Sequence, residues 1–115
     1  MAVWTAEQLK AIADSYLAEN FRHEKSAQVK ELALRLTVSP AEFGKLFAIV
    51  TGERASDYLR GRQIERAKDL LLNSQFSLNA VAYKSGFGTR TTFFRAFKRL
   101  TGMTPREFQG RARKG

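Results

Sequence analysis

Two stretches of this sequence follow one pattern: residues 93–102 read FFRAFKRLTG, and residues 43–52 read FGKLFAIVTG. Each contains two phenylalanines four positions apart, which fall on one face of an α-helix, and each ends in Thr-Gly, where a helix C-cap commonly lies. A small-residue helix start precedes each stretch, at Leu32-Ala33 and at Val81-Ala82. Because the offset between the copies is 49 before the turn and 50 after it, the pattern predicts two helix-turn-helix units, with one extra residue in the second turn.

Three helix starts carry cap signals. Ser39-Pro40 and Thr104-Pro105 each place a hydroxyl before a proline, with a glutamate two residues after the proline, and Thr5 opens a similar segment. These are the features of capping boxes with proline at the first helical position. Together with apolar spacings of three and four, they predict helices at about 5–19, 27–36, 40–51, 56–73, 78–85, 90–101 and 105–112. No segment alternates with a period of two, so the predicted fold is all-α with seven helices.

The charge is large and unevenly distributed. The chain has 115 residues and a formal net charge of +9, from 20 basic and 11 acidic side chains. Residues 1–69 carry a net charge of +1, whereas residues 70–115 carry +8 and a single acidic residue, Glu107. A local concentration of positive charge attracts a polyanion better than the same charge spread evenly. Nucleic acid is therefore the first partner that the composition predicts.

Several function classes find no support. The sequence has no cysteine and one histidine, His23, and its carboxylates lie among basic neighbours. Gly86-Phe87-Gly88 does not complete a dinucleotide-binding fingerprint. No apolar stretch approaches the length of a membrane span, since even the segment 93–97 contains an arginine, and the start has no signal-peptide layout. We therefore expect no enzyme activity, no cofactor, no metal, no small-molecule ligand and no membrane contact, and a cytoplasmic location together with the DNA.

The second unit carries a family signature. Val81-Ala82-x3-Gly86-Phe87, followed by Phe93-Phe94-Arg95-x-Phe97-Lys98-x2-Thr101-Gly102-Met103-Thr104-Pro105-x2-Phe108, resembles the DNA-binding domain of the AraC/XylS transcriptional regulators. The segment with Tyr58-Leu59, Arg62, Ala67 and Leu70-Leu71 resembles the linker helix of that family. The resemblance covers essentially the whole chain.

The resemblance implies a first helix-turn-helix subdomain at 1–54, a linker helix at 55–73 and a second subdomain at 74–115, forming one DNA-binding module. Each unit would insert a recognition helix into the major groove of duplex DNA. The resemblance further implies that the chain is part of a transcription regulator, which we expect to be an activator that also contacts RNA polymerase. The resemblance makes Arg62 a structural anchor between the halves. The predicted helix at 56–73 has 18 residues and spans about 27 Å, so with its flanking turns it brings the two recognition helices near the roughly 34 Å between successive major-groove openings.

In the second unit, a helical wheel puts Phe93, Ala96, Phe97 and Leu100 on the core face and basic and threonine side chains opposite. Arginine can form two hydrogen bonds with guanine, threonine can contact a thymine methyl, and lysine suits phosphate. We therefore expect Arg95, Thr91 and Arg90 to read bases, and Lys98 and Arg99 to contact mainly the backbone. The DNA-binding residues expected are Ser39, Ala41, Gly44 and Lys45 of the first unit, and Thr89, Arg90, Thr91, Thr92, Phe94, Arg95, Lys98 and Arg99 of the second.

The first recognition helix has fewer side chains that could contact DNA bases. The helical wheel of this helix places Phe43, Leu46, Phe47 and Val50 on the buried face and small side chains on the exposed face. Lys45 is therefore its one polar side chain suited to base readout. Either these small residues let the helix sit deep and read shape and methyl groups, or the unit contributes little sequence information. Thr37 also stands where Gly86 stands in the other turn. We expect the second unit to supply most of the affinity.

Three alternatives stay open on the sequence alone. Phe94 either lies at the edge of the core or projects into the groove against a thymine methyl. The chain is either a DNA-binding regulator or a basic helical adaptor for a protein, with only non-specific DNA affinity. A capped helix that begins at residue 5 leaves no room for a sensor domain, so the chain is either a complete monomeric regulator or the DNA-binding domain of a longer one that another domain dimerises.

Overall fold

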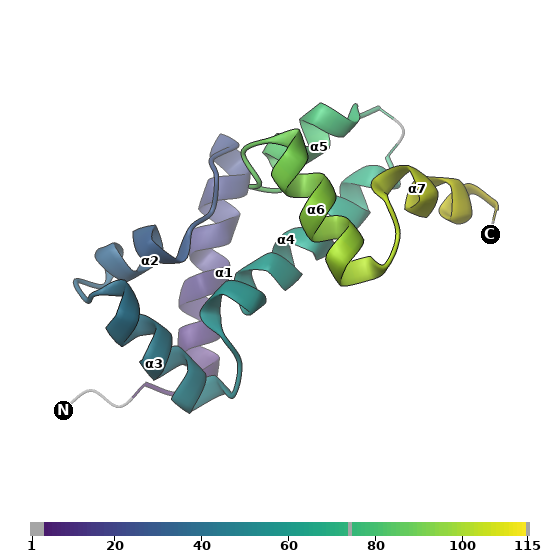
Figure 1. Ribbon diagram of the computed structural model, residues 1–115. Coiled ribbons are helices and arrows are strands. Elements are labelled where there is room, and N and C mark those ends of the chain that lie inside the picture. The colour runs from purple at the N-terminus through teal and green to yellow at the C-terminus, as the bar shows by residue number, and fades with distance from the viewer. Residues whose placement is uncertain (1–3, 74, 115) are drawn as a thin grey trace.

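The computed structural model describes residues 4–73 and 75–114, and in this part of the chain every regular element is an α-helix. The predicted all-α class is confirmed. The helices are α1 (Ala6–His23), α2 (Val29–Arg35), α3 (Pro40–Thr51), α4 (Ala55–Leu71), α5 (Leu78–Lys84), α6 (Arg90–Thr101) and α7 (Pro105–Lys114). They form an elongated body of 52 × 26 × 20 Å with α4 running through its middle (Figure 1).

The caps form largely as predicted. Thr5 and Thr104 each accept the backbone N–H three residues ahead, from Gln8 and Glu107, and those side chains accept the cap N–H in return. Ser39 accepts the Glu42 N–H at 3.1 Å, but within the described residues it makes only this half of the predicted box.

The first helix was predicted too short. It continues past residue 19 to His23, because tertiary contacts hold its last turn. The buried Asn20 donates from Nδ2 to the Ser26 carbonyl at 3.1 Å, and Phe21 packs against the first core. The other differences are smaller: α2 begins at 29 rather than 27, α4 ends at 71 rather than 73, and α7 continues to 114 rather than ending at 112.

The buried apolar side chains form two clusters, and α4 contributes to both. The first cluster joins α1, α2 and α3 to the start of α4 through Ala55 and Leu59. The second joins α5 and α6 to the later turns of α4 through Ile64, Ala67 and Leu71. Since α4 packs with one end in each cluster, its length sets how far apart the two units lie.

The two units also meet through hydrogen bonds. The loop between α1 and α2 reaches the turn between α5 and α6, where the Ala27 N–H donates to the Gly86 carbonyl at 2.9 Å. Gln63, fully buried on α4, donates from Nε2 to the carbonyls of Gly86 at 2.8 Å and Ser85 at 3.2 Å. A buried amide without such partners would cost stability, so this junction favours one relative placement of the units.

Candidate nucleic-acid interface

The two helix-turn-helix units repeat one another closely. Helix α2 (29–35) corresponds to α5 (78–84) at an offset of 49, and α3 (40–51) corresponds to α6 (90–101) at an offset of 50. Each recognition helix ends at a glycine in the left-handed region, Gly52 with φ 80° and Gly102 with φ 78°. The predicted repeat and its extra turn residue are confirmed.

The repeat extends to individual atoms beyond the recognition helices. Thr51 and Thr101 each donate their hydroxyl to a phenylalanine carbonyl one turn back, at 2.7 Å in both units. Each then accepts the N–H of the second residue after it, at 3.2 Å and 3.1 Å. The Phe47 ring lies 5.7 Å from the Tyr58 ring, and the Phe97 ring lies 5.6 Å from the Phe108 ring. The Thr-Gly pair therefore fixes the exit from each recognition helix in the same way.

The turns differ in how they reach the same conformation. Gly86 has φ 77°, and Thr37 at the equivalent position has φ 58°. Both residues are thus left-handed, so the two turns share this geometry although one has threonine where the other has glycine. The longer second turn adds another left-handed glycine, Gly88, with φ 80°. A β-branched residue in this region is strained where glycine is not.

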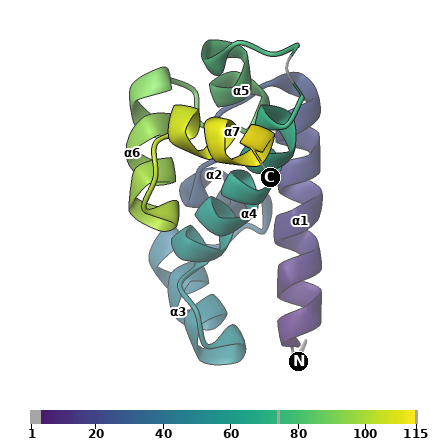
Figure 2. The same cartoon turned by 90° about the vertical axis from the view of Figure 1, so that its right-hand side faces the viewer.

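The recognition helices α3 and α6 lie on one side of the molecule. They run in similar directions in Figure 1. In Figure 2, α1 is on the right, and both α3 and α6 are on the left. Their first turns are capped by Ser39 and by Thr89, whose hydroxyl accepts the Thr92 N–H at 3.1 Å. Two capped helices on a common face are placed to approach one extended ligand together.

The exposed face of α6 is strongly basic. Phe93, Ala96 and Phe97 are buried, while Arg90, Thr91, Arg95, Lys98 and Arg99 are exposed. Leu100, which the helical wheel assigns to the core, is 45% exposed. That expectation was wrong because the last turn of α6 extends past the core that its middle turns contact.

Phe94 lies at the edge of the core rather than projecting freely. It is half-buried, and its ring packs edge-on against Phe93 with centroids 5.6 Å apart. The guanidinium of Arg90 lies 4.9 Å from the Phe94 centroid, over the ring. Stacking on an aromatic ring reduces the freedom of an arginine side chain, so Phe94 orients Arg90 at the first turn of α6.

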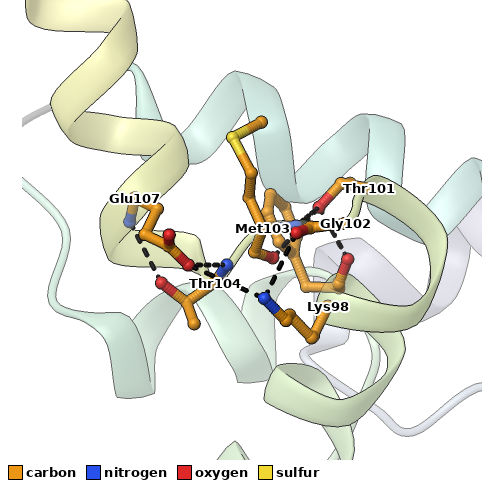
Figure 3. Close-up of polar contacts among 7 residues, drawn as sticks. Lys98, Thr101, Gly102, Met103, Thr104 and Glu107 are labelled. Atoms are coloured by element: carbon orange, nitrogen blue, oxygen red, sulfur yellow. Dashed lines mark hydrogen bonds and ion pairs between the residues drawn. The ribbon is translucent and has the colours of Figure 1, made fainter.

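Lys98 interacts with the next helix (Figure 3). Its Nζ donates to the Gly102 carbonyl at 3.2 Å and lies 3.9 Å from Oε1 of Glu107. Hydrogen bonds with Thr104 lower the pKa of Glu107, first through the Thr104 backbone N–H. The single acidic residue of the basic half therefore caps α7 and partly neutralises Lys98, which leaves Arg90, Arg95 and Arg99 as the main positive charges of α6.

The first recognition helix exposes smaller groups. Ala41, Lys45 and Ala48 are exposed, Gly44 is half-buried, and Ile49 is 82% exposed. Phe43 and Phe47 are buried as expected, whereas Leu46 and Val50 are only half-buried. Lys45 is the one basic side chain on this helix, so its face differs from that of α6 in chemistry rather than in position.

The structure corrects the anchor expected between the halves. Arg62 forms an exposed ion pair with Asp14 of α1, Nε to Oδ1 at 3.3 Å, so it joins α4 to the first unit. The residue of α4 that hydrogen-bonds to the turn of the second unit is its neighbour Gln63. The burial of Gln63 and of the half-buried Arg60 could not be read from the sequence, because the residues of the second unit that they contact lie more than twenty residues away and leave no local pattern.

Two helix-turn-helix motifs in one chain, joined by a shared helix and presenting their second helices on one side, define a tandem helix-turn-helix protein. The family model of the helix-turn-helix domain matches residues 32–111. The chain belongs to the AraC-type helix-turn-helix family, a family of DNA-binding domains of transcription regulators rather than of enzymes. The resemblance predicted from the sequence is confirmed.

Similar proteins agree with this assignment. The probable transcriptional regulator LumQ of Photobacterium leiognathi is 30% identical over 85% of the chain and 39% of its own length. A putative AraC-like transcription regulator of Streptomyces antibioticus is 30% identical over 88% of the chain and 35% of its own length. The chain thus spans well under half the length of these relatives. Among solved structures, the DNA-binding domain of AdpA in complex with a target DNA matches with a TM-score of 0.73 and 25% identity, over 89% of this chain and 93% of that one.

In the described part of the chain, no helix has the length and apolar character needed to cross a membrane.

Proposed function

We propose that this chain binds specific sites in duplex DNA as the DNA-binding module of a bacterial transcription regulator, with α3 and α6 in successive major-groove segments. The observation that carries the proposal is the pair of matched, capped recognition helices on one side of the molecule, with basic side chains exposed on α6. A single chain then reads two adjacent segments, so its site need not be palindromic.

The exposed side chains of α6 carry the readout in this proposal. Arg95, Thr91 and Arg90 contact base edges, because arginine and threonine match the donors, acceptors and methyl groups of the major groove. Arg99 and Lys98 contact backbone phosphates. Thr89 and Thr92 close the first turn by their mutual hydrogen bond of 2.9 Å, near the phosphate that this turn would meet, and Phe94 positions Arg90.

The face of α3 has a different role. Ser39 caps the helix near a phosphate, Lys45 contacts the backbone or a base, and Ala41 and Gly44 allow close approach of the helix to the groove floor. Small side chains favour the reading of shape and methyl groups over hydrogen-bonded readout. The second unit supplies most of the affinity.

Selection of DNA from a random pool tests the proposal. The chain is expected to enrich one sequence family that resists competition by random duplex, with binding that weakens as salt rises. Failure to enrich any sequence, with equal affinity for all duplexes, would instead support the alternative of a basic helical adaptor whose partner is a protein.

Other properties follow from the same proposal. In this proposal residues 1–54 and 74–115 are the two helix-turn-helix subdomains, and residues 55–73 are the linker helix. One chain binds one site as a monomer unless a further domain dimerises it. Activation of transcription through contact with RNA polymerase is the expected outcome, in the cytoplasm, where bacterial DNA lies. A reporter gene placed downstream of the selected site tests activation directly: expression should rise when the protein is produced.

A further inference from the structure

A cleft of about 430 Å³ is lined by residues of both units: by α2 and the loop before it, by α4, by the turn after α5 and by α6. Lys30 of α2, Ser56 of α4 and Thr92 of α6 are among these lining residues. A second groove, lined by Gly44 and Lys45 of α3, adjoins it and shares Val29 and Ser56 with it. The cleft therefore lies on the path between the two reading faces.

Arg60 of α4 lines this cleft in an unusual environment for a cation. It is half-buried, its guanidinium lies 5.4 Å from the Phe87 ring centroid, and its Nη1 donates to Oε1 of Gln63 at 3.3 Å. Within residues 4–73 and 75–114, no carboxylate forms an ion pair with it. Burial, and secondly the positive charge of Arg99, lower the pKa of Arg60.

Such an arrangement is unfavourable in the free protein. Partial burial of a charge without a counter-charge costs free energy, and a second cation nearby adds to that cost. The ring of Phe87 and the amide of Gln63 nevertheless hold the guanidinium in place. An anion that enters the cleft recovers this cost, and a phosphate matches the planar fork of an arginine well.

We propose that Arg60 binds a phosphate of the DNA backbone in the stretch that lies between the two major-groove segments. This inference rests on the proposed function, since it places DNA on the side of α3 and α6. Lys30 and the Thr92 hydroxyl border the same cleft and supply further donors. The contact is independent of base sequence, and Gln63 couples it to the junction between the units through the Gly86 carbonyl.

A matched pair of variants tests the role of Arg60. Arg60→Ala and Arg62→Ala remove one positive charge each from the same helix, but Arg62 lies about 200° further round and pairs with Asp14 of α1. On the duplex selected by the wild-type chain, Arg60→Ala is expected to weaken binding about tenfold and to reduce the slope of log affinity against log salt by about 0.9. Arg62→Ala should leave both quantities near the wild-type values. Equal affinities and slopes for the two variants would overturn the proposal.

Chemical modification of the DNA locates the contact. Neutral methylphosphonates are placed singly along the backbone of the selected duplex, between the two major-groove segments that the recognition helices would enter. One position is expected to weaken binding of the wild-type chain and to have no further effect on Arg60→Ala. If every position weakens both proteins equally, Arg60 contacts none of these phosphates.

Two further measurements distinguish the role of the guanidinium group from that of charge alone, and a loss of binding from a loss of folding. Arg60→Lys keeps the charge but loses the fork and much of the stacking, so it should retain the salt slope while binding more weakly; a wild-type affinity would show that charge alone acts. Thermal unfolding without DNA checks that each variant is folded. If the wild-type chain selects no sequence at all, the proposed function fails, whereas specific binding that is unchanged in Arg60→Ala contradicts only the role of Arg60.

Discussion

The two helix-turn-helix units share a scaffold and differ in the surface that they present. Their helix lengths, glycine C-caps and Thr51 and Thr101 hydrogen bonds agree closely. Their exposed faces do not, since α3 shows alanines, Ile49 and one lysine, whereas α6 shows three arginines and a lysine. The interior of the motif therefore fixes where the recognition helix lies, whereas the outward positions of that helix differ between the two units.

The largest expected effect tests whether the scaffolds are equivalent. Phe47→Ala and Phe97→Ala each remove a fully buried ring and should each lower the free energy of unfolding by about 3–5 kcal/mol. Urea unfolding followed by circular dichroism measures both. Leu100→Ala, at an exposed position of α6, is the control and should cost under about 0.5 kcal/mol. A cost confined to one of the two phenylalanines would break the equivalence.

The next effect tests whether the surfaces differ in function. Arg95→Ala should weaken specific DNA binding by about 1–3 kcal/mol and relax the preference for one base pair, because it removes a bidentate contact. Lys45→Ala should cost less. Competition binding on the selected duplex measures both, with the exposed Arg22 of α1 changed to alanine as a control for charge. A greater loss for Lys45→Ala than for Arg95→Ala would reverse the assignment of the main reader.

A third effect distinguishes Tyr58 from its counterpart Phe108. The Tyr58 hydroxyl donates to Oδ1 of Asp14 at 2.8 Å, and burial, followed by Asp14, raises the pKa of Tyr58 to about 12. In the unfolded chain the phenol of Tyr58 titrates near pH 10. The stabilisation from its hydrogen bond to Asp14 is therefore complete below pH 10 and is lost as the pH rises through 12.

Tyr58→Phe should therefore lower the free energy of unfolding by about 1 kcal/mol at pH 8, and the gap to the wild type should shrink at pH 11.5. Urea unfolding at the two pH values measures it, and contributions from Tyr16 are common to both proteins. A gap that stays constant with pH would show that the phenol of Tyr58 titrates alike in the folded and unfolded chains.

The smallest effect concerns the turns. Thr37 adopts φ 58°, where Gly86 stands in the second unit. Thr37→Gly removes left-handed strain of about 1–2 kcal/mol and adds unfolded-state entropy of about 0.5–1 kcal/mol, so a net gain of about 0.5 kcal/mol is expected. Thr37→Ala also loses the hydroxyl bond to the Leu36 carbonyl but keeps the strain, and it should not stabilise. Loss of stability in Thr37→Gly would mean that the threonine is better suited to this turn than glycine.

Local signals carried most of the fold prediction. The caps at Thr5, Ser39 and Thr104 and the Thr-Gly pairs depend on neighbours within a few residues, so their positions could be read from the sequence. The register of the repeat gave the extra turn residue. These features sufficed for the number, order and type of helices.

Long-range contacts account for what was missed. Gln63 and Arg60 have partners in the second unit, and a glutamine and an arginine on a charged helix give no sign of burial. Leu100 fits the wheel of α6 but extends past the core, which a helical period cannot reveal. Arg62 was expected to anchor the two halves, but it pairs with Asp14 of α1, which is distant in the sequence. The exposed face of α6, by contrast, could be predicted from the helical wheel, because the phenylalanines clearly mark the buried face and the exposed residues are those opposite to it.

The junction made by Gln63, Ala27 and the Gly86 carbonyl has a consequence for the physical state of the DNA. With the readers held at one separation and one relative rotation, the protein matches a particular number of base pairs and also a particular helical phase. One inserted base pair turns the second segment by about 35°. Superhelical tension, which overwinds or underwinds the duplex, shifts that phase without altering a single base, so binding by this chain would vary with the torsional state of the chromosome.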